Sequence, residues 1–148
     1  MLNEVFSVFD DLAVKHGLEK IKTVGDAYMC AGGLPFPSED HAHRVAEAAL
    51  ELTEFVEQAK TKAPDGIIHF DIRVGINSGP VVAGVIGRRR FLYDLWGDTV
   101  NTASRMESHG IPGKIQITET TRALLDDEFA CTERGVIEVK GKGPTRTW

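Results

Sequence analysis

Four polar residues in the segment 91–107 have the types and spacing needed to hold a polyanionic ligand. Asn101 and Arg105 are four residues apart, so on a helix they share one face, about one turn apart. A guanidinium can bind two phosphate oxygens at once. Asp94 precedes them in a strand-like run, and Asp98 is a candidate N-cap because its carboxylate can accept from free backbone N–H groups. The segment therefore predicts a strand, a turn and a helix that presents a phosphate-binding face.

Other charged residues lie in short segments whose patterns are less specific. Lys22 stands in a strand-like run, and Asp26 follows Gly25 in a pair typical of hairpin turns. Lys140 is followed by glycine, which allows close backbone approach to a ligand, and Arg89 is the middle of a basic triplet. Taken alone, each of these has an ordinary structural explanation as a turn residue or a solvated cation.

The elements that would position these residues alternate irregularly along the chain. Apolar periodicity and turn residues predict helices over 1–16, from a Ser38 cap to about 61, over 98–108, and from a Thr118 cap to 125. Strands are predicted over 18–23, 27–31, 67–77, 81–86, 91–96, 115–117, and from 135 to 139 and beyond. This order, with hairpins among it, favours an α+β fold with helices packed on a sheet.

Length and composition predict one globular domain over residues 1–148. The chain has 17 Lys+Arg against 22 Asp+Glu, a net charge of −5, which argues against a nucleic-acid binder. No apolar run approaches the roughly 20 residues that cross a bilayer, and the start does not resemble a secretory signal. Cys30 lies in an apolar run and is expected to be a buried, reduced thiol, so a cytoplasmic location is favoured.

Four segments together resemble the catalytic domain of the class III nucleotide cyclases, the adenylyl and guanylyl cyclases. They occur in the order of the family and span nearly the whole chain. The segments are Glu19–Met29, Arg73–Gly84, Tyr93–Arg105 and Val139–Gly143. The resemblance implies a ferredoxin-like β-α-β-β-α-β core, with helices packed on a mainly antiparallel sheet.

The resemblance also implies the nucleotide and the metal. Lys22 and Asp94 match the pair that reads the purine, with lysine donating to adenine N1 and aspartate accepting from the N6 amine. A guanine-selective site would typically carry Glu at the first position and Cys or a small polar residue at the second, so ATP is the implied substrate. Asp26 matches the second metal-binding aspartate, whose hard oxygens suit Mg²⁺ or Mn²⁺, with two ions in the complete site.

The remaining implied roles concern the sugar and the phosphates. Asn101 would position the ribose, and Arg105 would contact the α-phosphate as charge redistributes there. Arg89 and Lys140 match basic residues that contact the other phosphates, whereas Lys142 is expected to be solvated. The implied reaction converts ATP to 3′,5′-cyclic AMP and pyrophosphate.

The implied assembly is a head-to-tail homodimer with the site at its interface. One subunit would bring Asp26 and Arg89, and its partner the other five site residues. An upstream regulatory or membrane module is compatible with the family.

Two other functions stay open, guanylyl cyclase and a non-catalytic ATP-binding or dimerisation domain. The second depends on a departure from the family, because the strand with the first metal-binding Asp, in a Phe-x-Asp-Ile/Met pattern, would precede Met1. The family's final strand would also continue beyond Trp148. The expectation is a domain truncated at both ends and, as such a piece, nearly inactive.

Overall fold

The computed structural model describes residues 2–34, 36–62, 71–86, 92–139 and 142–148. The helices are α1 (Leu2–Lys15), α2 (His41–Lys62), α3 (Asp98–Ser108) and α4 (Glu119–Leu125). The strands are β1 (Glu19–Val24), β2 (Ala27–Ala31), β3 (Val74–Ile76), β4 (Val82–Ile86), β5 (Leu92–Trp96), β6 (Ile115–Ile117), β7 (Gly135–Val139) and β8 (Gly143–Thr147). The predicted α+β class is confirmed.

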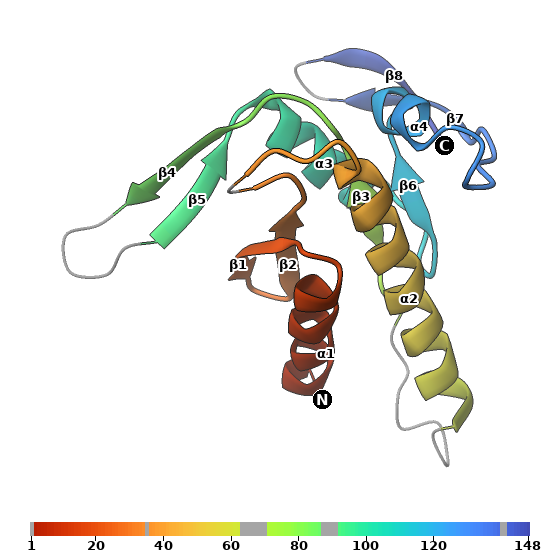
Figure 1. Cartoon of the computed structure of the whole chain (residues 1–148). Helices are drawn as coiled ribbons and strands as arrows, with labels where there is room; N and C mark the ends of the chain where they lie inside the picture. Colours follow the sequence, from red (N-terminus) through yellow and green to blue (C-terminus); the bar gives the residue numbers. More distant parts are fainter. Residues whose placement is uncertain (1, 35, 63–70, 87–91, 140–141) are drawn as a thin grey trace.

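The described strands pair in four units of two. Antiparallel pairs join β1 to β2, β4 to β5 and β7 to β8, whereas β3 and β6 run parallel. The β4–β5 pair extends away from the body as an arm, and β5 leads directly into α3 (Figure 1). Residues at the β5–α3 junction therefore lie between the arm and the body of the domain.

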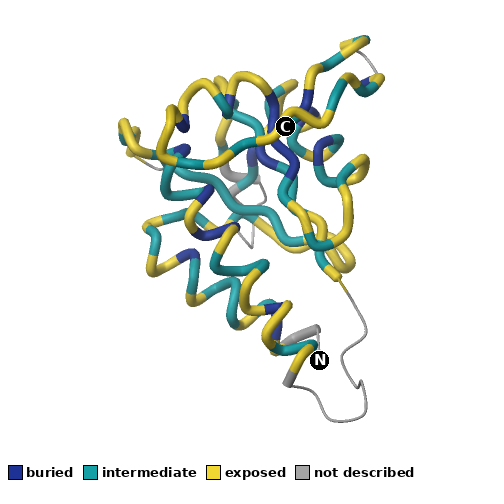
Figure 2. Tube along the Cα trace, turned by 90° about the vertical axis from the view of Figure 1, so that its right-hand side faces the viewer, coloured by how far each residue is buried: buried dark blue, intermediate teal, exposed yellow. Residues whose placement is uncertain are grey.

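The core lies where α2 and α4 pack against the parallel β3–β6 pair. Three alanines of α2, spaced three or four residues apart, give that helix one small apolar face, which allows close approach to the strands. The buried members are Ala42, Ala46, Ala49, Ile76, Ile117 and Leu125. Figure 2 shows these buried segments gathered in the body of the domain, with α1 and the turns more exposed.

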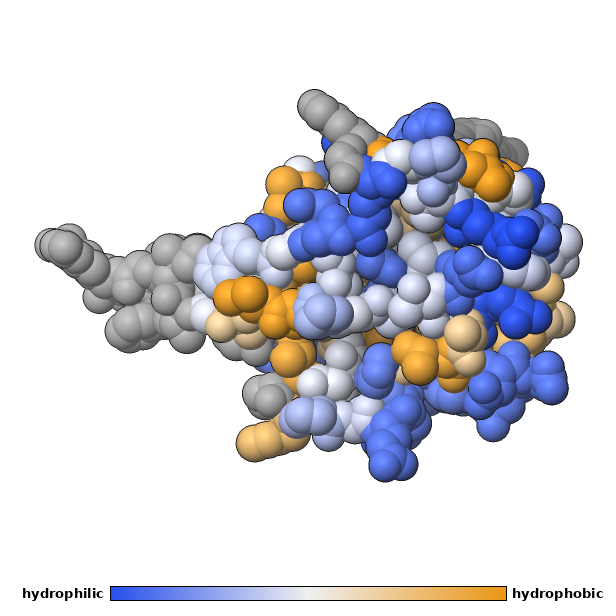
Figure 3. Space-filling view, turned by 90° about the horizontal axis from the view of Figure 1, so that it is seen from above, coloured by the Kyte–Doolittle hydropathy of each residue, from blue (hydrophilic) through white to orange (hydrophobic). Residues whose placement is uncertain are grey.

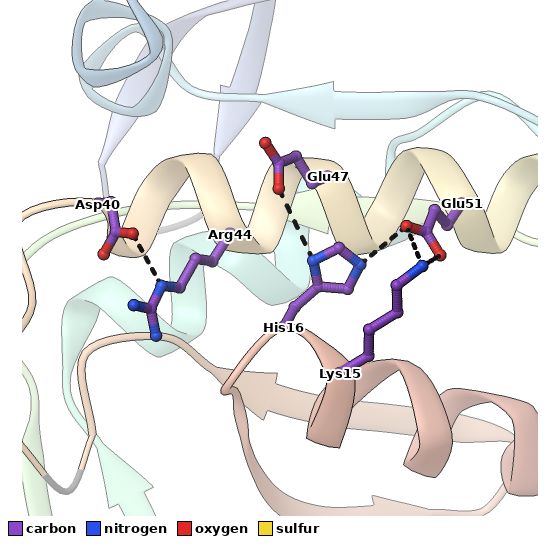
Figure 4. A network of polar contacts seen from close by, with 6 residues as sticks. All are labelled: Lys15, His16, Asp40, Arg44, Glu47 and Glu51. Carbon is purple, nitrogen blue, oxygen red and sulfur yellow. Dashed lines mark hydrogen bonds and ion pairs between the residues drawn. The ribbon is translucent and has the colours of Figure 1, made fainter.

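Helix α1 packs on the β1–β2 hairpin through aromatic side chains and on α2 through polar ones. The Tyr28 ring lies 5.7 Å from the Phe6 ring and 5.2 Å from the Phe9 ring, and its hydroxyl donates to Asp10. At the other end, His16 lies between two carboxylates of α2, Glu47 and Glu51 (Figure 4). These contacts fix the strand that carries Lys22 against the rest of the fold.

Several predicted boundaries are corrected by the structure. Ser38 does not cap α2, because residues 39–40 form a turn and the helix begins at His41. The strand predicted over 67–77 is limited, among its described residues, to Val74–Ile76. The predicted final strand is two strands, because the chain turns after Val139 and returns antiparallel as β8.

Two local predictions are confirmed. The β1–β2 hairpin turns at Gly25-Asp26, and the Thr118 hydroxyl caps α4 by accepting from the Thr121 N–H at 3.4 Å. Both depend on short sequence patterns whose partners are at most three residues away. Cys30 is free, as expected, and half-buried; burial raises the pKa of its thiol to about 11.

Candidate active site

Lys22 and Asp94 meet across the contact between β1 and β5. The Lys22 Nζ lies 3.0 Å from the Asp94 Oδ2, although the two residues are 72 positions apart. The Asp94 side chain is 13% exposed and the lysine side chain 44% exposed. The lysine hydrogen bond, followed by the bond from the Leu95 N–H, holds the pKa of Asp94 below its usual value. The carboxylate is therefore ionised at neutral pH and fixed in direction.

A bulge in β1 separates Lys22 from its neighbour Lys20. The pairing register shifts between these lysines, with Ile21 as the extra residue opposite β2. On a regular strand, residues two apart share a face and would meet the same partners. Here Lys20 pairs with Asp10 of α1 at 3.0 Å, whereas Lys22 pairs with Asp94. Since bulges redirect side chains, this one explains how two nearby lysines acquire different partners.

Asp26 lies in the turn between β1 and β2, and it is exposed to solvent. No hydrogen bond or ion pair among the described residues joins it to Asp94, Asn101 or Arg105. Its carboxylate is thus free to accept a ligand from outside its own chain.

Helix α3 separates its polar and buried residues onto different faces. Thr102 and Met106 are 2% and 0% exposed and face the core. Asn101 is exposed and Arg105 is half-exposed, and their spacing of four places them on a shared face, as predicted. No side-chain hydrogen bond or ion pair of either residue occurs within the described part of the chain, so both remain able to bind a ligand.

The first turn of α3 differs from the prediction. Gly97 occupies the N-cap position, and Asp98 is the first helical residue, without a side-chain capping bond. The Asp98 carboxylate instead pairs with Lys142, at 2.9 Å. Lys142 was expected to be solvated, and it is 39% exposed within this ion pair. The contact brings the start of β8 to the N-terminal end of α3.

Two predicted site residues, Arg89 and Lys140, lie outside the described residues. Sequence reasoning missed Asn77 and Thr99, whose hydrogen bonds join the end of β3 to α3. Only the position of Asn77 directly after a strand could have drawn attention to it. Its partners lie 22 and 41 residues further along the chain, beyond the reach of local patterns.

The metal implied by the resemblance is tested by the ligands present. Within the described ranges, no three His, Cys, Asp or Glu side chains form a group that could hold a metal ion. Mg²⁺ is usually bound by one or two carboxylates together with phosphate oxygens. The exposed carboxylate of Asp26 fits that arrangement as one hard ligand, if phosphate oxygens of a bound ligand supply others. No helix in the described part of the chain is long and apolar enough to cross a membrane.

Comparisons with known proteins agree on the family and differ on the nucleotide. An adenylate cyclase of Mycobacterium tuberculosis is 49% identical over 147 residues, covering 99% of this chain and 32% of the relative. The guanylate cyclase soluble subunit beta-2 of Rattus norvegicus is 49% identical over 149 residues, covering 100% and 22%. This chain therefore spans a third or less of the length of these curated relatives.

A solved structure has the same fold over nearly the whole chain. The guanylate cyclase domain of RhGC from Catenaria anguillulae, in complex with GTP, superposes with a TM-score of 0.89 at 41% identity. The likeness covers 99% of this chain and 79% of that one. The family model described as "Adenylate and Guanylate cyclase catalytic domain" matches residues 1–148. The chain belongs to the family of adenylate and guanylate cyclase catalytic domains.

Proposed function

We propose that residues 1–148 form the catalytic domain of an adenylyl cyclase, which converts ATP to 3′,5′-cyclic AMP and pyrophosphate. The observation that carries the proposal is the contact between Lys22 and Asp94. A lysine donor matches the adenine N1 acceptor, and a carboxylate matches the N6 amine. Guanine has an N–H at position 1 and an oxygen at position 6, so donor would face donor and acceptor would face acceptor.

The pair has the capacity to bind a base without losing its own bond. The Lys22 ammonium has three N–H donors and gives one to Asp94, and a carboxylate offers about four lone-pair sites. The carboxylate uses one site for the lysine and another for the Leu95 N–H. Spare donors and acceptors remain on both residues. A base that left them unpaired would be strongly disfavoured, which is how polar sites select their substrates.

The reaction needs positioning and charge stabilisation and no covalent enzyme intermediate. The ribose 3′-oxygen bonds to the α-phosphorus, the bond from that phosphorus to the pyrophosphate oxygen breaks, and the 3′-hydroxyl loses its proton. Asn101 would orient the ribose, and Arg105 would bind the α-phosphate in its transition state. When bound at Asp26, Mg²⁺ or Mn²⁺ supplies polarisation of oxygen and neutralisation of phosphate charge.

We further propose that the site is shared between the subunits of a head-to-tail homodimer. Asp26 has no described contact with the other site residues of its own chain, which favours their meeting across an interface. On the arm, Val82 and Trp96 are cross-strand partners and are 65% and 39% exposed. Figure 3 shows apolar surface toward the base of this arm. Asp26 and Arg89 would come from one subunit, and Lys22, Asp94, Asn101, Arg105 and Lys140 from its partner.

The base assignment is tested by exchanging the pair. In the protein at its natural full length, Lys22→Glu with Asp94→Cys should lower kcat/KM for ATP and raise the relative use of GTP. Lys20→Glu is the matched control, because Lys20 lies two residues away and pairs with Asp10 instead. The control should keep the parent's preference. An unchanged ATP-to-GTP ratio in the double variant would remove Lys22 and Asp94 from base recognition.

Guanylyl cyclase is the second candidate, favoured by the rat relative of equal identity. The same assay separates the two, because each nucleotide is supplied alone and its cyclic product is identified.

The shared site is tested by mixing two inactive variants, Asp26→Ala and Arg105→Ala. A heterodimer would contain one site lacking both groups and one intact site, so activity should return on mixing. If heterodimers form and activity does not return, the shared-site proposal is wrong.

The expected cytoplasmic location stays a prediction.

A further inference from the structure

The side chain of Asn77 bonds in two directions at the end of β3. Its Nδ2 donates to the backbone carbonyl of Thr99 at 3.1 Å, and its Oδ1 accepts from the Thr118 hydroxyl at 2.7 Å. Thr99 is the second residue of α3, and Thr118 caps α4 directly after β6. A single amide group therefore connects both parallel strands of the core to the first turn of α3.

The partners of Asn77 determine which way its amide must face. A carbonyl can only accept, so the Nδ2 must point to Thr99 and the Oδ1 to Thr118. Because Thr118 gives its one proton to Asn77, the bond of 3.2 Å between Thr118 and Thr121 must be donated by Thr121. Ser78 then donates to Thr121 at 2.9 Å. The donors form one directed chain from Ser78 to the Thr99 carbonyl.

The middle of this chain is removed from water, whereas Asn77, Ser78 and Thr99 are half-buried. Thr118 is 5% exposed and Thr121 is 0% exposed. Leaving a buried donor or acceptor without a partner costs about 1–3 kcal/mol, so the bonds at Thr118 and Thr121 are expensive to break. The directed chain therefore resists rearrangement more strongly than a surface contact would.

Thr99 is held by the same segment through two more contacts. Its hydroxyl donates to the Pro80 carbonyl at 2.6 Å. A Cβ at Gly79 would lie 2.7 Å from that hydroxyl oxygen, so the loop backbone closes directly on the Thr99 side chain. Asn77, Gly79 and Pro80 thus all lie against Thr99, two residues before Asn101.

We propose that Asn77 is a positioning residue, which sets the first turn of α3 and through it the placement of Asn101 and Arg105. Asn77 itself contacts no substrate. The inference rests on the proposed function, because it assigns a kinetic consequence to the position of those two residues. A misplacement of about 1 Å can cost on the order of 100-fold in rate, so one lost bond at Thr99 should be visible in kcat.

The test compares Asn77→Asp with Ser78→Ala in the full-length protein. The aspartate has the same shape and still accepts from Thr118, but it has no N–H for the Thr99 carbonyl. Ser78→Ala removes a bond from the far end of the same chain, the one to Thr121 of α4, and leaves the bond to Thr99 in place. We expect kcat to fall about 10- to 100-fold in Asn77→Asp, with KM for ATP within about 3-fold of the parent. Ser78→Ala should stay within about 2-fold in both.

Amide hydrogen exchange provides a readout that does not depend on activity. Exchange over residues 99–103 should accelerate in Asn77→Asp and stay close to the parent in Ser78→Ala. Equal protection in the three proteins would overturn the proposal. If the parent makes no cyclic nucleotide, the proposed function fails, and the exchange result still decides whether Asn77 holds α3.

A coupled substitution separates positioning from general destabilisation. If Asn77 acts through α3, the kcat loss of Asn77→Asp should shrink at least about 3-fold in an Arg105→Ala background, because residues acting as a unit are not additive. Loss by the same factor in both backgrounds would show that Asn77 affects the rate by another route, and the proposal would be wrong.

Discussion

Two regions of the candidate site hold their polar side chains in opposite ways. Around the start of α3, a chain of hydrogen bonds runs from Ser78 to the carbonyl of Thr99, buried at Thr118 and Thr121 and half-buried at its ends. Between β1 and β5, one ion pair joins Lys22 to Asp94, and its lysine is 44% exposed. The first region has all its bonds within the protein, whereas the second has donors and acceptors still facing solvent.

The difference indicates a division of tasks. Breaking a buried polar bond costs about 1–3 kcal/mol, so we expect the bonds at Thr118 and Thr121 to persist when a ligand binds. The β1–β5 pair has a half-exposed lysine and spare donors and acceptors, so it can bind a base without breaking its own bond. Rate should therefore depend on the α3 region, and nucleotide preference on the β1–β5 pair.

The largest expected effect concerns the contact between β3 and α3. A Cβ at Gly75 would lie 2.1 Å from the Glu107 backbone nitrogen and 2.6 Å from the Ala103 carbonyl oxygen. Since neither strand nor helix backbone can move freely, Gly75→Ala should lower the free energy of unfolding by about 4 kcal/mol or more, measured by urea denaturation.

The matched control for that substitution is Gly25, in the turn that follows β1, the strand that carries Lys22. At Gly25 an added Cβ meets no atom within 4 Å, but its φ is +59°. Gly25→Ala should therefore cost only about 1–2 kcal/mol, from backbone conformation alone. An equal loss of unfolding free energy at Gly75 and Gly25 would contradict the expected effect of the close packing between β3 and α3.

The next effect is kinetic and belongs to α3. Arg105→Ala should lower kcat about 10²- to 10³-fold, the size expected when a transition-state donor is lost. Arg73→Ala is the control, because Arg73 also contacts α3, through Glu107 at 3.2 Å, but at the opposite end of the helix from Asn101. It should keep kcat within about 2-fold. A changed ATP-to-GTP ratio in Arg105→Ala would contradict the proposed division of tasks, because nucleotide preference is assigned to the β1–β5 pair.

The smallest effect is the pH dependence of the exposed pair. The Lys22 hydrogen bond lowers the pKa of Asp94, so the pair stabilises the folded state at any pH above the ordinary pKa of an aspartate in the unfolded chain. The contribution is lost as the pH falls through the folded-state pKa. Lys22→Met should raise the pKa of Asp94, as followed by NMR titration of its carboxyl carbon. An unchanged pKa would mean that the Leu95 N–H alone sets it.

Local signals in the sequence predicted much of the fold. The Gly25-Asp26 turn and the Thr118 cap are determined by residues within a few positions, and both are confirmed. Asp98 was predicted as a cap because its type is right. The helix begins one residue earlier than that role requires, and its carboxylate pairs with Lys142 instead. A difference of one residue at a helix start lies below the resolution of sequence patterns.

The features that arrange the site depend on contacts between distant segments. The bulge at Ile21 is a register shift in the pairing of β1 with β2, and no residue type in that strand signals it. The bridge made by Asn77 requires Thr99 and Thr118, which come together only when the parallel β3–β6 pair forms. The resemblance to the family identified Lys22 and Asp94 as a pair, and the structure adds that they are in direct contact.

The central claim is that the Lys22–Asp94 pair selects adenine. The most direct measurement is kcat/KM for ATP and for GTP, supplied separately to the unmodified full-length protein at the same metal concentration. If the pair selects adenine, kcat/KM should favour ATP at least about 100-fold, because guanine would leave polar groups of the pair unmatched. A ratio near one, or a preference for GTP, would contradict it.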